Sequence, residues 1–251
     1  MIMQIMPQST AFADQPEPAV RKKKKFNASL PFSPFTPYAE LFGERVPLVQ
    51  CLELAVGNYL RQAFISQLRR PFTAVECGVY TGSSLVATAK ILQRHHLRYK
   101  LYGLDTFSGL PPLSDKDKVF APTDAPYREQ TFFTDTSLES VTSKVKDAGL
   151  SKQVTLLPGL FTDTLPQLKP DRFHFVNIDC DLYEPHLECL NYFYPRLLKG
   201  GVIFFDDYHS VEYPMAAKAI DDFLADKPER LFHLRFGDDA PNRTKSFIVK
   251  Y

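Results

Sequence analysis

Two pairs of acidic residues follow apolar segments of this 251-residue chain. Asp179 and Asp181 come at the end of HFVNIDCD, and Asp206 and Asp207 come at the end of GGVIFFDD. Carboxylates that pack together without a counter-charge repel one another, so that one of them must stay protonated. A hard divalent cation such as Mg²⁺ removes this cost, because it prefers oxygen ligands. The two pairs therefore predict a metal site rather than helix caps and solvated loop residues, although Asp181 alone would also suit a helix start.

Three classes of enzyme use carboxylates in this way. An Asp-x-Asp pair after an apolar strand occurs in glycosyltransferases that hold a nucleotide-sugar through a metal. The pair also suits an aspartyl-phosphate phosphatase, but that motif ordinarily begins its fold and has Thr or Val where this chain has Tyr183. The third class is a metal-dependent methyltransferase, in which a glycine turn and a further acid hold S-adenosylmethionine. A protein that binds this cofactor without catalysis is an alternative outside the enzymes.

A glycine-containing turn, ECGVYTGSS, runs from Glu76 to Ser84 after an earlier apolar segment. Gly78 lets a ligand approach the backbone, and Ser83 or Ser84 can cap a helix whose first amides attract a carboxylate or phosphate. The turn is neither a G-x-G-x-x-G dinucleotide motif nor a P-loop. Asp105 ends the next apolar segment, where an acid can accept both hydroxyls of a ribose. A tight turn explains either feature alone, but together they favour a nucleoside-containing cofactor.

The elements that must position these residues alternate between strands and helices. This alternation predicts an α/β fold with a doubly wound, mostly parallel seven-stranded sheet and one antiparallel strand near the C-terminus. Ligands of such sheets bind beyond the carboxyl ends of the strands, where all of these acids lie. Strands are expected at 73–79, 100–106, 154–159, 174–180, 201–207, 231–237 and 245–251. Helices are expected at 46–68, 83–93, 138–148 and 215–224, with a short one at 160–168 and another that opens near Pro185 and closes at 200–201.

Composition limits the partners and the compartment. The chain is 44% hydrophobic and 24% charged with a net charge of +1, so bulk electrostatics favour neither nucleic acid nor an anionic membrane surface. No apolar stretch approaches the roughly 20 residues needed to cross a bilayer. The four cysteines lack C-x-x-C spacing, which indicates buried thiols in a reducing compartment. No secretory signal pattern opens the chain. We therefore expect a cytoplasmic protein with a small-molecule partner.

The chain is expected to form one domain with an appendage. Residues 1–40 are rich in Pro, Ser, Gln and Lys and predict a flexible arm, whereas 41–251 form the main domain. Residues 41–70 form an N-terminal helical cap. The polar, Pro-rich segment 109–131 is either a lid or a disordered surface insertion. The amphipathic helix of the cap and the aromatic part of the arm could supply the interface of a homodimer.

The combination of motifs resembles the macrocin-type (TylF-like) O-methyltransferases of natural-product biosynthesis. The resemblance implies a class I, Rossmann-like methyltransferase that uses S-adenosylmethionine and Mg²⁺. Many members continue DLYE with Ser-Thr, where this chain has Pro185 and His186. The matching stretches arrive in the family's order over about residues 70–225 and are ECGVYTGSS, LDTFSGLP, GLFTDTLP, NIDCDLYEP, LLKGGVIFFDDY and AAKAIDDF.

The resemblance also implies roles for individual residues. It makes Asp179, Asp206 and Asp207 the metal ligands and Asp181 the general base. The residues implied to bind the cofactor are Glu76, Gly78, Tyr80 and Ser84 along its methionine part, Asp105 at the ribose, Thr106, Phe107 and Ser108 near the adenosine, and Gly159 and Phe161 beside the adenine.

These assignments lead to a hypothesis for the reaction. An acceptor hydroxyl of a sugar or phenol attacks the sulfonium methyl in line, while Mg²⁺ lowers the pKa of that hydroxyl and Asp181 takes its proton. Two adjacent hydroxyls could chelate the metal, so vicinal diols are the first substrates to test. His209, which follows the second acidic pair, is an alternative base or substrate contact.

Overall fold

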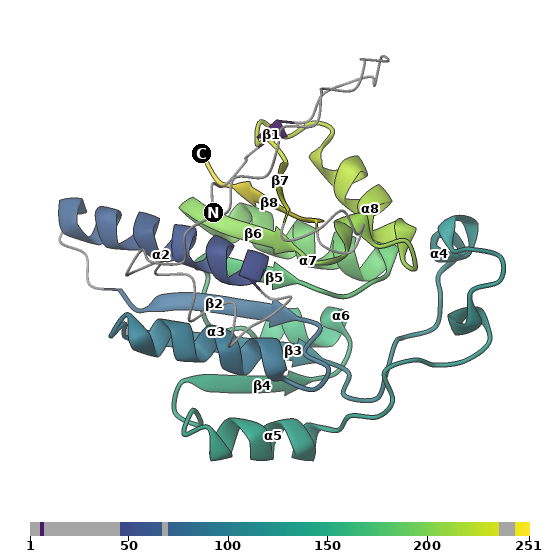
Figure 1. Cartoon of the computed structure of the whole chain (residues 1–251), viewed down its shortest axis with the longest axis horizontal. Coiled ribbons are helices and arrows are strands. Elements are labelled where there is room, and N and C mark those ends of the chain that lie inside the picture. The colour runs from purple at the N-terminus through teal and green to yellow at the C-terminus, as the bar shows by residue number, and fades with distance from the viewer. Residues whose placement is uncertain (1–5, 8–45, 67–69, 236–243) are drawn as a thin grey trace, which may run out of the picture.

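A single mostly parallel sheet forms the centre of the protein. The computed structural model describes residues 6–7, 46–66, 70–235 and 244–251 (Figure 1). The strands are β1 (Met6–Pro7), β2 (Phe72–Cys77), β3 (Tyr99–Asp105), β4 (Val154–Pro158), β5 (Phe173–Ile178), β6 (Leu197–Phe205), β7 (Phe232–Arg235) and β8 (Thr244–Val249). They lie in the order β1-β7-β8-β6-β5-β2-β3-β4.

The strand directions confirm the expected fold class. β2 to β6 pair in parallel, whereas β8 is antiparallel to both of its neighbours, β6 and β7. Seven strands therefore form the predicted sheet, with one reversed strand near the C-terminus. The two-residue β1 pairs with the outer edge of β7 and was not expected.

Helices cover both faces of the sheet, and each face has its own hydrophobic core (Figure 1). Successive strand residues point to opposite faces, so that Ala74 packs in the first core and Val75 in the second. The first face carries α2 (Val46–Ser66), α3 (Ser83–Arg94) and α5 (Leu138–Asp147), and the second carries α6 (Phe161–Thr164), α7 (Tyr183–Phe193) and α8 (Pro214–Leu224).

The helix that follows the first acidic pair is shorter than expected. α7 ends at Phe193, a 3₁₀ turn (Tyr194–Arg196) follows, and β6 already begins at Leu197. The glycine pair at 200–201, which we expected to stop this helix, lies inside β6 instead. Gly200 has a φ of 75°, and an added Cβ would lie 2.9 Å from the Gln62 side chain of α2. The glycine thus lets α2 approach β6 and does not terminate α7.

The segment 109–131 has defined structure. It contains α4 (Asp115–Phe120) and a 3₁₀ turn (Pro126–Arg128). Ala121 and Tyr127 are buried in a third hydrophobic cluster together with Tyr183 of α7 and Met215 of α8. The segment therefore packs against two helices, which argues against a disordered insertion. Its movement as a lid stays a prediction.

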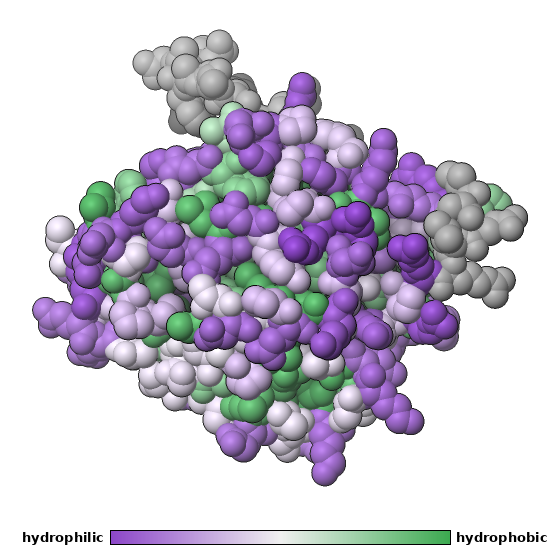
Figure 2. All heavy atoms as spheres, turned by 180° about the vertical axis from the view of Figure 1, so that it is seen from behind, coloured by the Kyte–Doolittle hydropathy of each residue, from purple (hydrophilic) through white to green (hydrophobic). Residues whose placement is uncertain are grey.

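Several expectations fall outside the described residues. They concern residues 1–5 and 8–40 of the arm, 41–45 of the cap, the last two residues of the first expected helix, and 236–237 of an expected strand. Within the described ranges, no helix is both long enough and apolar enough to cross a membrane. The rear surface mixes hydrophilic and hydrophobic residues without one dominant hydrophobic area (Figure 2). All four cysteines are buried and form no disulfide.

Candidate active site

A cavity lies at the carboxyl ends of the parallel strands. Its volume is about 930 Å³, near the upper end of the range for ligand pockets, about 300–1,000 Å³. Residues that follow β2, β3, β4, β5 and β6 all contribute to its lining. This is the edge of the sheet at which the sequence placed the acids and the glycine turn.

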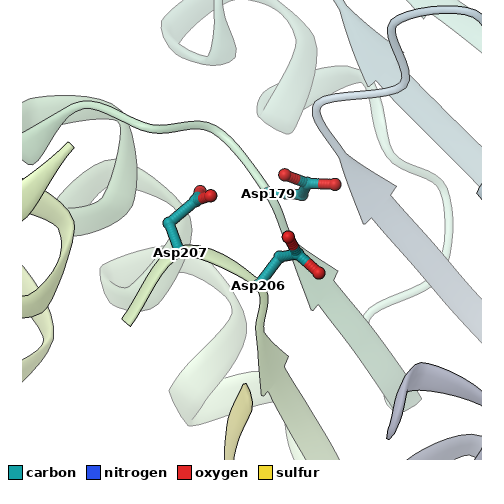
Figure 3. Close-up of side chains that lie close together, drawn as sticks. All are labelled: Asp179, Asp206 and Asp207. Carbon is teal, nitrogen blue, oxygen red and sulfur yellow. The ribbon is translucent and has the colours of Figure 1, made fainter. Parts of the chain in front are cut away.

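Three acids converge on one point of this cavity. Asp179 follows β5, and Asp206 and Asp207 follow β6, with their carboxylates directed toward one another (Figure 3). One oxygen from each carboxylate lies within 4.8 Å of the others. Backbone bonds extend the ladders to this point, since the Asp179 amide donates to Cys77 O at 2.9 Å and the Asp206 amide to Ile178 O at 3.1 Å. The parallel pairing of β5 and β6 thus brings the acids together.

The electrostatics of this cluster favour a bound cation. Burial, and then the charges of Asp206 and Asp207, raise the pKa of Asp179 well above its usual value. Burial and the charge of Asp206 raise the pKa of Asp207 to about 7. The carboxylates therefore resist ionisation together in the absence of a cation. Three oxygen donors at this spacing fit a small, hard divalent ion, which would relieve the repulsion.

Asp181 lies beside the cluster in a strained turn. Its φ is 60°, and its amide donates to Asp207 Oδ2 at 2.9 Å. Burial, and then the charges of Asp207 and Asp206, raise the pKa of its carboxyl group well above the usual range. The N-cap of α7 is Leu182, without a side-chain cap, so the alternative role of Asp181 as a helix cap is not seen. Asp181 instead lines the cavity.

Gly78, in the turn after β2, lies against the backbone of Asp179 in the acid cluster. Its φ is 88°, and an added Cβ would lie 1.6 Å from Asp179 O. The amides of Val79 and Tyr80 donate to Asp105 Oδ2 at 2.6 and 2.8 Å. The amide of Phe107 donates to the other oxygen of Asp105 at 2.7 Å. Asp105 therefore orders the turn. Its Oδ2 already accepts two amide hydrogens, so the oxygen with a lone pair left for a ribose hydroxyl is Oδ1.

Most of the residues expected to bind a cofactor line the cavity, and three do not. Glu76 is fully buried, and its Oε1 accepts from Ser84 Oγ at 2.5 Å. Phe107 is also buried, whereas Ser108 is exposed. The cofactor candidates in the lining are Gly78, Tyr80, Ser84, Asp105, Thr106, Gly159 and Phe161.

Two residues at the cavity were not identified from the sequence. Asn177 lies on β5 opposite Glu76 of β2, and its buried Oδ1 has no hydrogen-bond partner among the described residues. The strand period could have indicated it, because it stands two positions before Asp179. Lys245 of β8 donates to Asp206 Oδ2 at 2.5 Å. Only the antiparallel register of β8 places it there, and no motif signals that register.

Two histidines lie near the acids. His186, one of the departures from the family pattern, is fully buried, with Nδ1 2.8 Å from Leu182 O and Nε2 3.9 Å from Asp207 Oδ2. His209 lines the cavity, and its Nε2 is 3.2 Å from His233 Nδ1. Burial lowers the pKa of both His186 and His209 to about 4. A base with so low a pKa is weak, which weighs against His209 as the general base.

The fold of this chain, with a site at the carboxyl ends of its parallel strands, is that of the class I methyltransferases. Such enzymes match the architecture described above, and the solved O-methyltransferase NovP superposes on this chain with a TM-score of 0.66. The family model of the macrocin O-methyltransferases (TylF) matches residues 62–229. The chain belongs to this family, which confirms the resemblance found in the sequence motifs.

Relatives of known activity are O-methyltransferases that act on natural products. Demethyldecarbamoylnovobiocin O-methyltransferase of Streptomyces niveus is 30% identical over 178 residues, which are 70% of this chain and 63% of that protein. Mycinamicin III 3''-O-methyltransferase of Micromonospora griseorubida is 32% identical over 185 residues, which are 69% of this chain and 71% of that protein. The chain thus spans less than two thirds of the novobiocin relative.

Solved structures extend the similarity to the fold. NovP is 26% identical, and the match covers 82% of this chain and 79% of NovP. The calicheamicin methyltransferase CalS11 is 23% identical with a TM-score of 0.58, and the match covers 89% of this chain and 87% of that protein. At that identity, CalS11 supports the fold alone.

Proposed function

We propose that this protein is an S-adenosylmethionine- and Mg²⁺-dependent O-methyltransferase. Its acceptor would be a hydroxyl of a small natural product, on a sugar or in a vicinal diol or phenol. The observation that carries this proposal is the convergence of Asp179, Asp206 and Asp207 beside the Gly78 turn in one cavity. Family membership and the names of the relatives support it, and they weigh against a glycosyltransferase or a phosphatase.

The cofactor would lie along the turn between β2 and α3. Gly78, Tyr80 and Ser84 would border its methionine part, and Asp105 would accept a hydrogen bond from the ribose. Gly159 has a φ of 134°, and its amide donates to Asp105 O at 2.9 Å, so the start of the β4 loop lies beside Asp105. Phe161 would then border the adenine. The negative acid cluster would favour a positively charged sulfonium at the far end.

Asp179, Asp206 and Asp207 would hold the divalent cation. When bound, this cation would lower the pKa of an acceptor hydroxyl and orient two adjacent hydroxyls. The three residues follow two neighbouring strands, and ladder bonds fix the backbones of Asp179 and Asp206. Their contribution is therefore a preformed set of oxygen ligands that does not need to be ordered when the ion arrives.

Asp181 would act as the general base. The cofactor would supply an electrophilic methyl group to the acceptor oxygen, with S-adenosylhomocysteine as the second product. The Asp181 carboxylate would take up the proton of the acceptor hydroxyl. Burial, the largest cause of its raised pKa, would make Asp181 a better proton acceptor than an ordinary aspartate, whereas the effect of the Asp206 and Asp207 charges would fall once these residues hold a cation.

Ligand-dependent thermal stability tests the proposal. The protein is melted with S-adenosylhomocysteine, with UDP and with buffer alone, each with and without Mg²⁺ and after treatment with EDTA. The proposal expects a higher melting temperature with S-adenosylhomocysteine, a further effect of Mg²⁺ and none of UDP. Stabilisation by UDP would instead indicate a nucleotide-sugar enzyme. Binding of S-adenosylhomocysteine without any effect of Mg²⁺ would indicate a metal-free methyltransferase or a non-catalytic binder.

A further inference from the structure

Lys245 reaches the acid cluster from the reversed strand of the sheet. Its ammonium donates to Asp206 Oδ2 at 2.5 Å and to the main-chain oxygen of the same residue at 2.9 Å. The side chain is largely buried, with 19% of its surface exposed. Because β8 is antiparallel to β6, its first residues lie at the cavity, and Phe205 pairs with Ser246. Lys245 is therefore the next residue outward, beside Asp206.

The carboxylates around the proposed metal position carry more negative charge than a divalent ion alone can neutralise. Asp179, Asp181, Asp206 and Asp207 supply four carboxylates to one wall of the cavity. A divalent ion would neutralise two of these charges when all four are ionised. Among the described ion pairs, the lysine contact with this cluster comes from Lys245 alone. Its ammonium already occupies one side of the Asp206 carboxylate.

We propose that Lys245 is a built-in counter-ion that competes with the metal ion for Asp206 and thereby sets the metal affinity of the site. This inference rests on the proposed metal-dependent function. In the metal-free protein the ammonium stabilises the crowded carboxylates. Once a divalent ion binds the same carboxylate, two cations lie closer together than the screening length of physiological salt, about 8 Å, and repel each other. Lys245 thus stabilises the metal-free site and weakens metal binding.

A purely structural role for Lys245 predicts the opposite change in affinity. If the lysine only held the Asp206 side chain in place, its removal would loosen a ligand and weaken metal binding. Ordering one short carboxylate side chain changes affinity only about threefold or less. A single positive charge next to a doubly charged ion changes it by about tenfold or more, even in a largely aqueous dielectric. The electrostatic effect therefore determines the sign.

Lys245→Met tests this role, because methionine keeps the length of the side chain and removes its charge. Lys250→Met is a matched control, since Lys250 lies at the other end of the same strand and pairs with Glu229 at 3.1 Å. Titration calorimetry with Mg²⁺ and with Mn²⁺ measures metal affinity without an acceptor substrate. We expect Lys245→Met to bind the metal about tenfold more tightly or more and to melt at a lower temperature in EDTA. Lys250→Met should keep the wild-type affinity.

Two further variants protect the test against a folding defect. Lys245→Arg keeps the positive charge and should keep an affinity within about threefold of the wild type. Lys245→Gln removes the charge with a polar side chain and should bind the metal more tightly, as Lys245→Met does. Unchanged or weaker affinity in the two neutral variants would overturn the role of Lys245. Absence of metal binding in the wild-type protein would overturn the metal site itself, which is a distinct result.

Discussion

At the scale of single residues, Asp181 differs from the three acids beside it. Its carboxylate is not part of the group whose oxygens lie within 4.8 Å of one another. Its amide, however, is bound to Asp207, which fixes its position relative to that group. The residue is thus held next to the proposed metal position with its side chain available to the acceptor. Because the backbone holds the position of Asp181, a substitution of its side chain can test the proposed role as a base.

Asp181→Asn should lower kcat by about 10²- to 10⁴-fold, because an amide cannot take up the hydroxyl proton. The affinity for S-adenosylhomocysteine should stay within about twofold of the wild type, since Asp181 is not placed along the cofactor. Methyl transfer to an accepted substrate and calorimetric binding of S-adenosylhomocysteine measure the two quantities. The matched control is Asp226→Asn, an exposed aspartate paired with Lys227. Full turnover in the Asp181 variant would remove the base assignment.

The sequence allowed the acids to be predicted but not their neighbours. Asp179 and Asp206 directly follow apolar strands, and such positions can be read from the pattern alone. Lys245 and His186 could not be found in this way. The contact of Lys245 depends on which residue of β8 faces Phe205, and His186 is fully buried with its Nε2 3.9 Å from Asp207 Oδ2. Register and burial are tertiary properties that a local pattern does not contain.

At the scale of elements, α4 is fastened to the start of α7. Asp117 of α4 is almost fully buried, and its Oδ1 accepts from the amide of Tyr183 at 2.7 Å. Its other oxygen accepts from Ser114 Oγ at 2.6 Å, within a capping box. Tyr183 is the first residue of α7 and stands two positions after Asp181. The short helix α4 therefore supports the turn that carries the proposed base.

Asp117→Ala should lower the free energy of unfolding by about 1–3 kcal/mol, because the buried amide of Tyr183 loses its partner. It should also reduce kcat, since the Asp181 turn is no longer held. Chemical denaturation and steady-state kinetics measure these effects. Asp115→Ala on the same helix is the control, because that side chain is fully exposed. If both variants were as stable and as active as the wild type, the proposed support by α4 would be wrong.

The elements that sequence patterns missed have local causes. α4 has only six residues and begins with a capping box. It is too short to show a helical period of apolar residues. The end of α7 was placed too late, because the glycine pair at 200–201 was interpreted as a helix stop. Pro195 in the turn after α7 is the better signal, as proline cannot continue the helical hydrogen bonds. Long periodic elements such as α2, α3 and α8 were predicted closely.

At the scale of the whole molecule, the acid cluster should make stability depend on pH. The pKa of Asp207 is raised to about 7 in the folded protein, against about 3.9 in an unfolded chain. Between these values the folded state binds more protons than the unfolded state. The contribution of Asp207 to the free energy of unfolding therefore falls as pH rises from about 4 to about 7. Buried histidines with lowered pKa values oppose this trend. The pH dependence of stability must therefore be compared between the wild type and a variant that lacks the Asp207 carboxyl group.

Asp207→Asn removes this contribution and leaves the histidines in place. It also removes the charge that helps to raise the pKa of Asp179 and of Asp181, which changes the pH dependence in the same direction. In EDTA, the melting temperature of the variant should rise relative to that of the wild type as pH is raised from 5 to 8, by about 2–4 °C for each kcal/mol. Saturating Mg²⁺ should instead favour the wild type, which keeps all three ligands. Differential scanning calorimetry at several pH values measures the difference. A difference that does not change with pH would contradict the raised pKa.

The overall architecture was predictable because it follows from alternation. Apolar strands alternate with amphipathic helices over most of the chain, and this pattern permits few topologies. The position of β8 between β6 and β7 also agrees with two closing strands that have no helix between them. The two-residue β1 could not be expected, because a pairing this short carries no periodic signal.

The reversal of β8 has a consequence for how the charge at the proposed metal site could change during evolution. Adjacent strand residues face opposite sides, so sliding β8 by a single position would replace the ammonium with the hydroxyl of Ser246. The charge at the ion-binding corner would then change while every ligand stayed in place. Lys245 also lies past residue 229, where the family pattern stops. The register of β8, a strand that the shared motifs do not cover, could thus change which ion the proposed site prefers.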